Sequence, residues 1–399
     1  MNQTAKRNQA TGFAAGPSRR GVMKTLAASG LALPSVQSVA TAASPDAMTL
    51  RITRYEVLHV QIPHREELAE AYLATNIQQG MYPPRTWNRK TLVKFHTDAG
   101  LVGVADALTG RHPYASSEQL EATLKGMIGR SPWEFLHDDA IGGLIMGMYD
   151  LVGQATGLPV ARLFSSNPKP RIVQTWWSHC YPPSLMASEA KLAVSLGYRV
   201  HKVKARPWQD PIEQAAAICE VVPKDFRIWV DANAWWQSPS RALFFIDQLS
   251  KFHNYFAVES PVRYRDVEAY RALKGKSALI VSDHIGPEPM PFIREELLDA
   301  FILGIRLGKT LVQQVLMAEV TGIPCWVEHS IGTGIAKVFQ AHHAAAFPGI
   351  EYAIDTTHVF EDDFMKEPFE MKDGFYQLPT KPGLGVTLDD DAVDRYRFA

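Results

Sequence analysis

Short apolar segments alternate with amphipathic segments over the second half of this chain. The apolar segments are 172–177, 200–205, 227–231, 255–259, 278–282, 300–305 and 324–328. Stretches with helical periodicity follow them, for example 211–222, 238–251 and 310–320. Strands that alternate with helices form parallel sheets, because each helix carries the chain back to the edge where the next strand starts. Seven or eight such units within roughly 200 residues predict a closed barrel rather than an open sheet.

Charged side chains stand where four consecutive apolar segments end. Lys202 and Lys204 close one segment, and Asp231, Glu259 and Asp283 follow at intervals of 24 to 28 residues. These side chains therefore fall at the same level of successive strands, which in a parallel barrel is the mouth where active sites form. Three converging carboxylates repel one another unless a cation neutralises them, and such oxygen ligands suit Mg²⁺ or Mn²⁺. The sequence predicts a divalent-metal site beside a pair of lysines.

The segment before the barrel mixes strand and helix patterns. Residues 48–60 predict a strand, 91–106 predict a hairpin that turns at 98–100, and 117–165 are mostly helical in pattern. Residues 63–89 are polar and aromatic and contain three prolines. They predict a long loop, and long loops of this kind are commonly functional.

Residues 1–43 have the pattern of an export signal. Arg19-Arg20 precede a moderately apolar run at 25–33, and Ala40-Thr41-Ala42 offers a small–x–small cleavage pattern. This arrangement resembles a twin-arginine signal, so we expect a periplasmic or otherwise exported protein. The chain has no uninterrupted run of about 20 apolar residues, and we expect no membrane span.

Composition excludes two further classes of protein. The 41 basic and 42 acidic residues give a net charge of −1, so no basic excess exists to neutralise the phosphates of a nucleic acid. A hydrophobic content of 46% is too high for a disordered chain. The three cysteines are too widely spaced to indicate a zinc site or a disulfide framework.

The order and spacing of the motifs resemble the enolase superfamily, in particular its mandelate racemase and muconate lactonizing enzyme branches. The resemblance covers about residues 48–396. It rests on Tyr149-Asp150-Leu151-Val152-Gly153, His201-Lys202-Val203-Lys204, Val230-Asp231-Ala232-Asn233, Val258-Glu259-Ser260-Pro261, Ser282-Asp283, Ile331-Gly332-Thr333 and Lys381-Pro382-Gly383-Leu384-Gly385-Val386. It implies an α/β fold, a modified (β/α)₇β TIM-type barrel with an α+β capping domain. The cap is formed by the N-terminal segment and the C-terminal tail.

The resemblance also implies a division of the chain. After the signal at 1–43, residues 44–170 would form the cap and 171–378 the barrel, and 379–399 would return to the cap as a tail. The loop at 63–89 would be the specificity loop that closes over the substrate. Members of this family commonly form dimers to octamers, so a homo-oligomer is expected.

The chemistry implied by the resemblance is removal of the proton α to a carboxylate, through an enediolate. Mg²⁺, or alternatively Mn²⁺, stabilises the charge that develops on the small-molecule carboxylate substrate. Asp231, Glu259 and Asp283 would hold the ion. Lys204 would transfer the proton, and Lys202 would tune it or contact the substrate carboxylate, because burial and neighbouring positive charge lower the pKa of a lysine.

Other residues near the expected mouth complete the candidate site. His329, at the end of the seventh strand, is a candidate second acid or base. Arg306 is expected to clamp a carboxylate, because an arginine is effectively never deprotonated. Glu328 and His329 would point to opposite faces of a regular strand, so only one of them should line the pocket fully. Asn233 and Trp235 follow the ligand loop and are expected to contact the substrate.

The sequence alone is compatible with several functions. With His329 as a second acid, dehydration of a sugar acid is favoured; with Lys204 acting alone opposite Arg306, a cycloisomerase or lyase fits better. A racemase or epimerase would need two groups on opposite faces of the substrate. A different class is an exported, non-catalytic carboxylate-binding protein. A metal-dependent aldolase, with a Schiff base on Lys204, is disfavoured by the three phased carboxylates.

Overall fold

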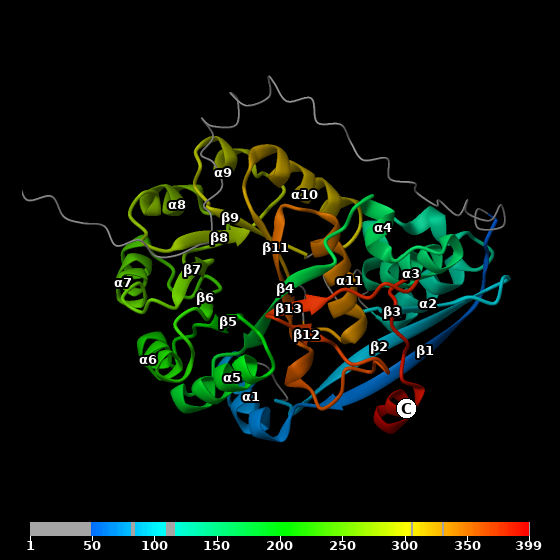
Figure 1. The fold of residues 1–399 in the computed structure, drawn as a ribbon, viewed down its shortest axis with the longest axis horizontal. Coiled ribbons are helices and arrows are strands. Elements are labelled where there is room, and N and C mark those ends of the chain that lie inside the picture. The colour runs from blue at the N-terminus through cyan, green and yellow to red at the C-terminus, as the bar shows by residue number, and fades with distance from the viewer. Residues whose placement is uncertain (1–48, 81–83, 109–115, 305, 329–330, 399) are drawn as a thin grey trace, which may run out of the picture. The chain divides into compact units, whose positions relative to one another are not determined.

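A closed barrel of parallel strands lies at the centre of the unit Ala43–Ala399 (Figure 1). The structure is a computed structural model that describes residues 49–80, 84–108, 116–304, 306–328 and 331–398. The expected export signal at 1–43 and the candidate residue His329 lie outside these ranges. Both therefore stay predictions from the sequence.

Within the described residues, eight parallel strands form the barrel. The strands are β4 (Arg171–Ser178), β5 (Val200–Lys204), β6 (Arg227–Asp231), β7 (Tyr255–Glu259), β8 (Ile280–His284), β9 (Ala300–Leu303), β10 (Cys325–Val327) and β11 (Ile350–Asp355). Each strand pairs with the next, and β11 pairs in parallel with β4, so the sheet closes on itself. The predicted barrel is confirmed, and its last strand, β11, was not among the seven apolar segments recognised in the sequence.

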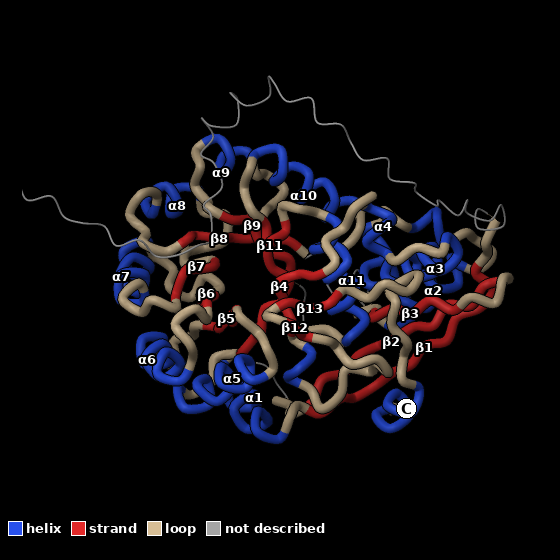
Figure 2. The backbone as a smooth tube through the Cα atoms, in the orientation of Figure 1, coloured by secondary structure: helices blue, strands red, loops and turns tan. Residues whose placement is uncertain are grey.

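A helix follows each strand from β4 to β10 and lies outside the barrel (Figure 2). These helices are α5 (Pro183–Ser195), α6 (Pro211–Val221), α7 (Pro239–Leu249), α8 (Val267–Leu273), α9 (Met290–Arg294), α10 (Lys309–Thr321) and α11 (Gly334–Ala346). Several begin at a residue whose side chain accepts a hydrogen bond from the first turn, as Asp210, Ser238 and Asp266 do. Such caps satisfy backbone N–H groups that have no partner within the helix, so the sequence itself marks where these helices begin.

The barrel interior changes from apolar to polar along β5, β6 and β7. Buried apolar side chains fill it at Val200, Trp229, Phe256, Ala257, Ala300, Ile302 and Trp326. Trp229 and Trp326 stack there with ring centroids 4.5 Å apart. Side chains two positions apart on a strand share a face, so Lys202, Asp231 and Glu259, each two positions beyond one of these residues, also point inward. The apolar layer thus forms a floor under a polar mouth.

The cap joins an antiparallel sheet to a group of helices. Its strands are β1 (Ile52–Pro63), β2 (Trp87–Thr97) and β3 (Val102–Asp106), and the helical segments are α2 (Ser117–Met127), η3 (Pro132–Phe135), η4 (Asp139–Leu144), α3 (Ile145–Thr156) and α4 (Val160–Phe164). The predicted hairpin is the β2–β3 pair. Gly147 on α3 permits close packing on this sheet, because a Cβ there would lie 2.8 Å from the Phe95 ring.

The predicted loop at 63–89 contains a helix instead, α1 (Glu66–Gln78). Contacts with the barrel hold this helix: the Thr75 hydroxyl donates to the carbonyl of Cys180 at 3.1 Å, and Arg65 pairs with Glu189 at 2.6 Å. Its buried positions have helical spacing, but two of the four buried residues, Thr75 and Asn76, are polar, so the apolar periodicity of the sequence is weak. The prediction of a loop was wrong because tertiary contacts, which a single segment does not reveal, stabilise the helix.

The C-terminal segment runs from the barrel back to the cap. Strands β12 (Met371–Lys372) and β13 (Phe375–Gln377) form an antiparallel hairpin that extends the barrel sheet at β4. The N–H of Leu384 then donates to Asp150 at 2.8 Å, and helix α12 (Asp390–Tyr396) packs against β1. The predicted modified (β/α)₇β barrel, with a cap shared between both ends of the chain, is therefore confirmed.

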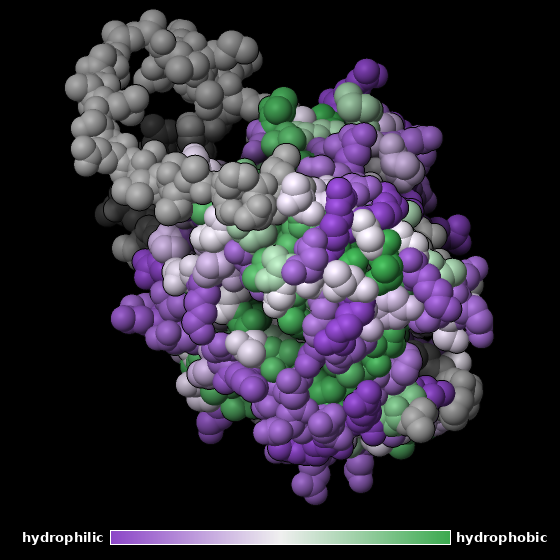
Figure 3. All heavy atoms as spheres, turned by 90° about the vertical axis from the view of Figure 1, so that its right-hand side faces the viewer, coloured by the Kyte–Doolittle hydropathy of each residue, from purple (hydrophilic) through white to green (hydrophobic). Residues whose placement is uncertain are grey.

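The surface on the cap side mixes apolar and polar groups. Hydrophobic residues gather near the middle of this face, and hydrophilic residues surround them (Figure 3). Within the described part of the chain, no helix combines the length and the apolar character that crossing a membrane requires.

His342 provides a test of how the cap and the tail are joined. The N–H of Ala161 donates to its Nδ1 at 3.2 Å, so its Nε2 carries the proton and donates to the carbonyl of Leu384 at 3.0 Å. Burial lowers the pKa of His342 to about 4. The unfolded chain therefore binds more protons below about pH 6.5, and stability must fall as the pH falls from there toward 4.

We predict that protonation of His342 in the unfolded chain lowers the unfolding free energy by about 2 kcal/mol when the pH falls from 7.5 to 5. In His342→Gln the difference between the two pH values should shrink by about that amount, although the variant is less stable at both. Urea unfolding at the two pH values measures it. The matched control is His253→Gln, which changes an exposed histidine and should leave the pH dependence unchanged. An unaltered pH dependence in His342→Gln would contradict the assignment.

Candidate active site

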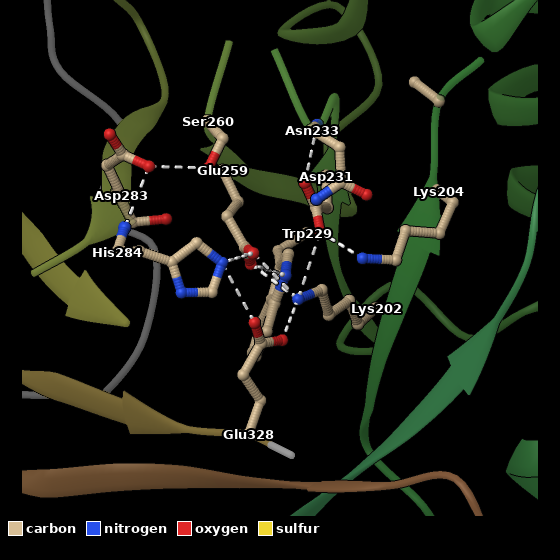
Figure 4. Close-up of polar contacts among 12 residues, drawn as sticks. Lys202, Lys204, Trp229, Asp231, Asn233, Glu259, Ser260, Asp283, His284 and Glu328 are labelled. Atoms are coloured by element: carbon tan, nitrogen blue, oxygen red, sulfur yellow. Dashed lines mark hydrogen bonds and ion pairs between the residues drawn. The ribbon is translucent and has the colours of Figure 1, made fainter. Parts of the chain in front are cut away.

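Lys202 is the centre of the polar mouth (Figure 4). Its side chain is fully buried, and its ammonium nitrogen lies 2.8 Å from a carboxylate oxygen of Glu259 and 3.2 Å from one of Asp231. It also forms a close ion pair with Glu328. The carboxylates come from the ends of β6 and β7 and from the residue after β10, so one buried cation joins side chains from three parts of the barrel.

Lys204, the second lysine of the motif, pairs with Asp231 Oδ2, the same oxygen that Lys202 contacts. Its side chain keeps 12% of its surface exposed, so it reaches toward the open end of the barrel. Burial is the main cause that lowers the pKa of Lys204, and the neighbouring Lys202 adds to it, while Asp231 opposes the change. Burial alone would raise the pKa of Asp231, but the two lysines and Arg206 hold it well below its usual value.

Glu259, Glu328 and His284 form a second group beside Lys202. The His284 Nε2 lies 3.2 Å from Glu328 Oε1 and 3.5 Å from Glu259 Oε1. The Trp229 indole N–H donates to the other oxygen of Glu259 at 3.1 Å. Burial, together with the nearby Asp231 and Glu328, raises the pKa of Glu259 well above its usual value. Burial thus favours the protonated form of Glu259 more than water would.

Asp283 is placed differently from the sequence-based expectation. Its carboxylate accepts hydrogen bonds from the Ser260 hydroxyl at 2.7 Å and from the backbone N–H groups of His284 at 2.8 Å and Arg265 at 3.1 Å. Neighbouring residues on a strand point to opposite faces. Because His284 points toward Glu259 and Glu328, Asp283 points away from them (Figure 4). Asp231 and Glu259 converge as expected, but Asp283 does not join them.

Asn233 and Trp235 lie at the rim of the mouth. The Asn233 backbone N–H donates to Asp231 at 2.8 Å, and its side-chain amide donates to the hydroxyl of Tyr264 at 2.9 Å. Trp235 is 38% exposed and packs edge-on against Trp208, with ring centroids 5.9 Å apart. Trp235 thus lines a rim groove of about 460 Å³ rather than the polar mouth itself.

Arg306 was expected at the mouth, whereas Arg206 and His284 were not selected from the sequence. The Arg306 side chain is exposed, and no described hydrogen bond or ion pair joins it to the lysines or carboxylates of the mouth. Arg206 is buried and contacts both the Asp231 carbonyl and the Asn233 side chain. His284 faces the carboxylates of Glu259 and Glu328. The sequence did contain a signal for Arg206. It stands two positions after Lys204, and side chains with that spacing share one face of an extended segment.

Comparison with known proteins decides the family. The family model described as "Enolase C-terminal domain-like" matches residues 185–392, more than half of the chain. This chain belongs to the enolase superfamily. The matched range spans nearly all of the barrel, including both lysines and the carboxylates described above.

Relatives of this enolase-superfamily chain include isomerases and lyases. N-succinyl-L-Arg/Lys racemase of Bacillus cereus is 24% identical over 372 residues, covering 86% of this chain and 97% of the relative. Arabinonate dehydratase of Saccharolobus solfataricus is 28% identical over 271 residues, covering 64% of this chain and 72% of the relative. The chain is therefore an enzyme of this superfamily, and both reaction classes are represented among its relatives.

Solved structures share the fold of this superfamily member. The crystal structure of the Bacillus cereus racemase matches with a TM-score of 0.72 at 22% identity and covers 88% of this chain and 98% of its own. A dipeptide epimerase from Enterococcus faecalis, crystallised with Mg and the dipeptide L-Leu-L-Tyr, matches with a TM-score of 0.70 at 21% identity. It covers 84% of this chain and 99% of its own.

The burial of Lys202 predicts a large effect of its removal on stability. In Lys202→Met, three neighbouring carboxylates lose their shared ammonium, and breaking such a buried ion pair costs about 3–5 kcal/mol. We expect a loss of that size in the unfolding free energy, measured by urea denaturation with a chelator present. Adding Glu328→Gln to the same chain should recover part of it, because one uncompensated charge is removed.

The control is Lys191→Met, which changes an exposed lysine on α5 and should alter stability by less than about 0.5 kcal/mol. A Lys202→Met protein as stable as the unmodified chain would show that this ion cluster does not hold the barrel mouth together.

Proposed function

We propose that this enzyme removes the proton α to the carboxylate of a small-molecule acid and that Lys204 accepts it. The observation that carries the proposal is the position of two lysines on one strand at the barrel mouth, facing carboxylates from neighbouring strands. The two lysines are not equivalent. Lys202 is fully buried among three carboxylates, whereas Lys204 has one carboxylate partner and a partly exposed side chain.

Lys204 is therefore the lysine that can reach a substrate entering from the open end. A base must come within hydrogen-bond distance of the proton that it removes, and a fully enclosed side chain does not satisfy that condition. Lys202 would hold Asp231 and Glu259 in place and keep positive charge beside Lys204. Arg206, which contacts the Asp231 carbonyl and Asn233, would fix the loop that follows β6.

The mouth also fits a divalent cation, for which the resemblance favours Mg²⁺. At this mouth, among the described residues, the carboxylates of Asp231, Glu259 and Glu328 gather around one buried ammonium group. Glu259 and Glu328 offer carboxylate oxygens toward one another and would hold the ion. A bound divalent cation supplies positive charge that stabilises the anion developing on the substrate carboxylate.

The fate of the anion distinguishes the proposed reactions. Loss of a β-hydroxyl group would make the enzyme an acid-sugar dehydratase, and rearrangement would make it a cycloisomerase. Return of the proton to the opposite face would make it a racemase or epimerase, the second candidate. The second candidate is favoured by the racemase relative, which this chain matches over 97% of that protein's length.

Exchange of the substrate α-proton with solvent tests the proposal. The protein would be incubated in deuterated water with a panel of aldonic acids, N-succinyl amino acids, dipeptides and the lactones of muconates, and followed by ¹H NMR. We expect Lys204→Ala to lower the exchange rate of any active compound by about 10²–10⁴-fold, the usual contribution of a general base.

The matched control for this test is Lys191→Ala on the barrel exterior, which should exchange at the unmodified rate. Circular dichroism spectra should be alike for all three proteins, since Lys204 has only one ion-pair partner among the described contacts. Exchange at the unmodified rate in Lys204→Ala would remove this lysine from the mechanism.

A further inference from the structure

Three side chains at the mouth offer ligand atoms at the spacing of a metal site. One carboxylate oxygen from Glu259, one from Glu328 and one ring nitrogen of His284 all lie within 4.8 Å of one another. The His284 Nε2 stands 3.2 Å and 3.5 Å from the two carboxylate oxygens. Ligand atoms bound to one ion at about 2.1 Å are separated from their neighbours by about 3.0 to 3.4 Å. The two distances from His284 are therefore already close to the spacing of ligands around one ion.

Asp283 is not available as the third ligand. One of its oxygens already accepts hydrogen bonds from Ser260 and from the His284 N–H, and the other accepts the Arg265 N–H. These bonds hold the end of β8 with Asp283 turned outward. The same bonds thereby direct the His284 ring toward Glu259 and Glu328 (Figure 4).

The position between these two glutamates already attracts a cation. The ammonium of Lys202 is paired with both Glu259 and Glu328. With Lys204 and Arg206 included, three positive side chains stand beside the three carboxylates of this mouth. A bound dication would add positive charge to this balanced set, and the carboxylate of the proposed substrate would offset part of it.

We propose that Glu259, His284 and Glu328 form the metal site and that it binds first-row transition-metal dications more tightly than Mg²⁺. The inference rests on the proposed function only in placing the cation in the active site. An imidazole nitrogen is a preferred ligand for transition metals, whereas Mg²⁺ takes oxygen ligands and keeps much of its water. A mixed nitrogen and oxygen set therefore discriminates between the two classes.

Metal titration of the chelator-treated full chain tests the ligand set. Co²⁺ would be followed by its visible absorption bands, and Mg²⁺ by competition against bound Co²⁺. We expect Co²⁺ to bind at least about tenfold more tightly than Mg²⁺. His284→Gln should lose most of that preference, with Mg²⁺ affinity nearly unchanged. Asp283→Asn should retain it, since Asp283 positions His284 and does not bind the ion.

A spectroscopic measurement identifies the nitrogen ligand directly. Electron spin echo spectra of bound Mn²⁺ should contain ¹⁴N coupling in the unmodified protein and in the control His253→Gln, and should lose it in His284→Gln. This readout holds even if Asp283→Asn fails to fold. The proposal is overturned if the unmodified protein shows no nitrogen coupling, or if a folded Asp283→Asn protein does not bind the metal while His284→Gln does.

The outcome separates this inference from the proposed function. If nitrogen coupling is absent but Lys204→Ala still abolishes α-proton exchange, the ligand set is wrong and the proposed function stands. If nitrogen coupling is present but Lys204→Ala exchanges normally, the metal site stands and the assigned base is wrong.

Discussion

The buried ammonium of Lys202 is the interaction on which the mouth of the barrel depends. It pairs with carboxylates from the ends of β6 and β7 and with Glu328 beyond β10. A buried charge is stable only when it is paired and hydrogen-bonded, so the strands cannot separate without leaving several charges uncompensated. Beneath the mouth lies an apolar layer in which Trp229 stacks on Trp326. The geometry that places Lys204 beside Asp231 follows from this arrangement.

The cap stabilises the loops that surround that mouth. Asp139 in the cap accepts hydrogen bonds from the backbone of Gly308 and Thr310, at the start of α10. Asp106, at the end of β3, accepts the N–H and the hydroxyl of Thr333, just before α11. Both carboxylates lie at helix N-termini, where they satisfy N–H groups that the helix leaves free. The loops after β9 and β10 are therefore held by the cap and not by the barrel alone.

Much of the site could be predicted because it obeys local rules. The alternation of apolar and amphipathic segments predicted the barrel, and the period of two predicted that Lys202, Asp231 and Glu259 share its interior. The placement of Asp283 could not be predicted in this way. Asp283 and His284 are adjacent, both can bind a metal, and the sequence does not state which one turns inward. Hydrogen bonds from Ser260 and Arg265, which follow the preceding strand β7, decide it.

The sequence by itself determined the barrel, the lysine pair and the superfamily, because each depends on spacing along single strands and on motif order. Tertiary structure decided what depends on contacts between distant segments. Helix α1 forms where a loop was predicted because Thr75 and Arg65 bind the barrel across more than 100 residues of chain. Likewise, Glu328 and His284 become neighbours only because β8 and β10 close into one barrel, and no local pattern encodes that closure.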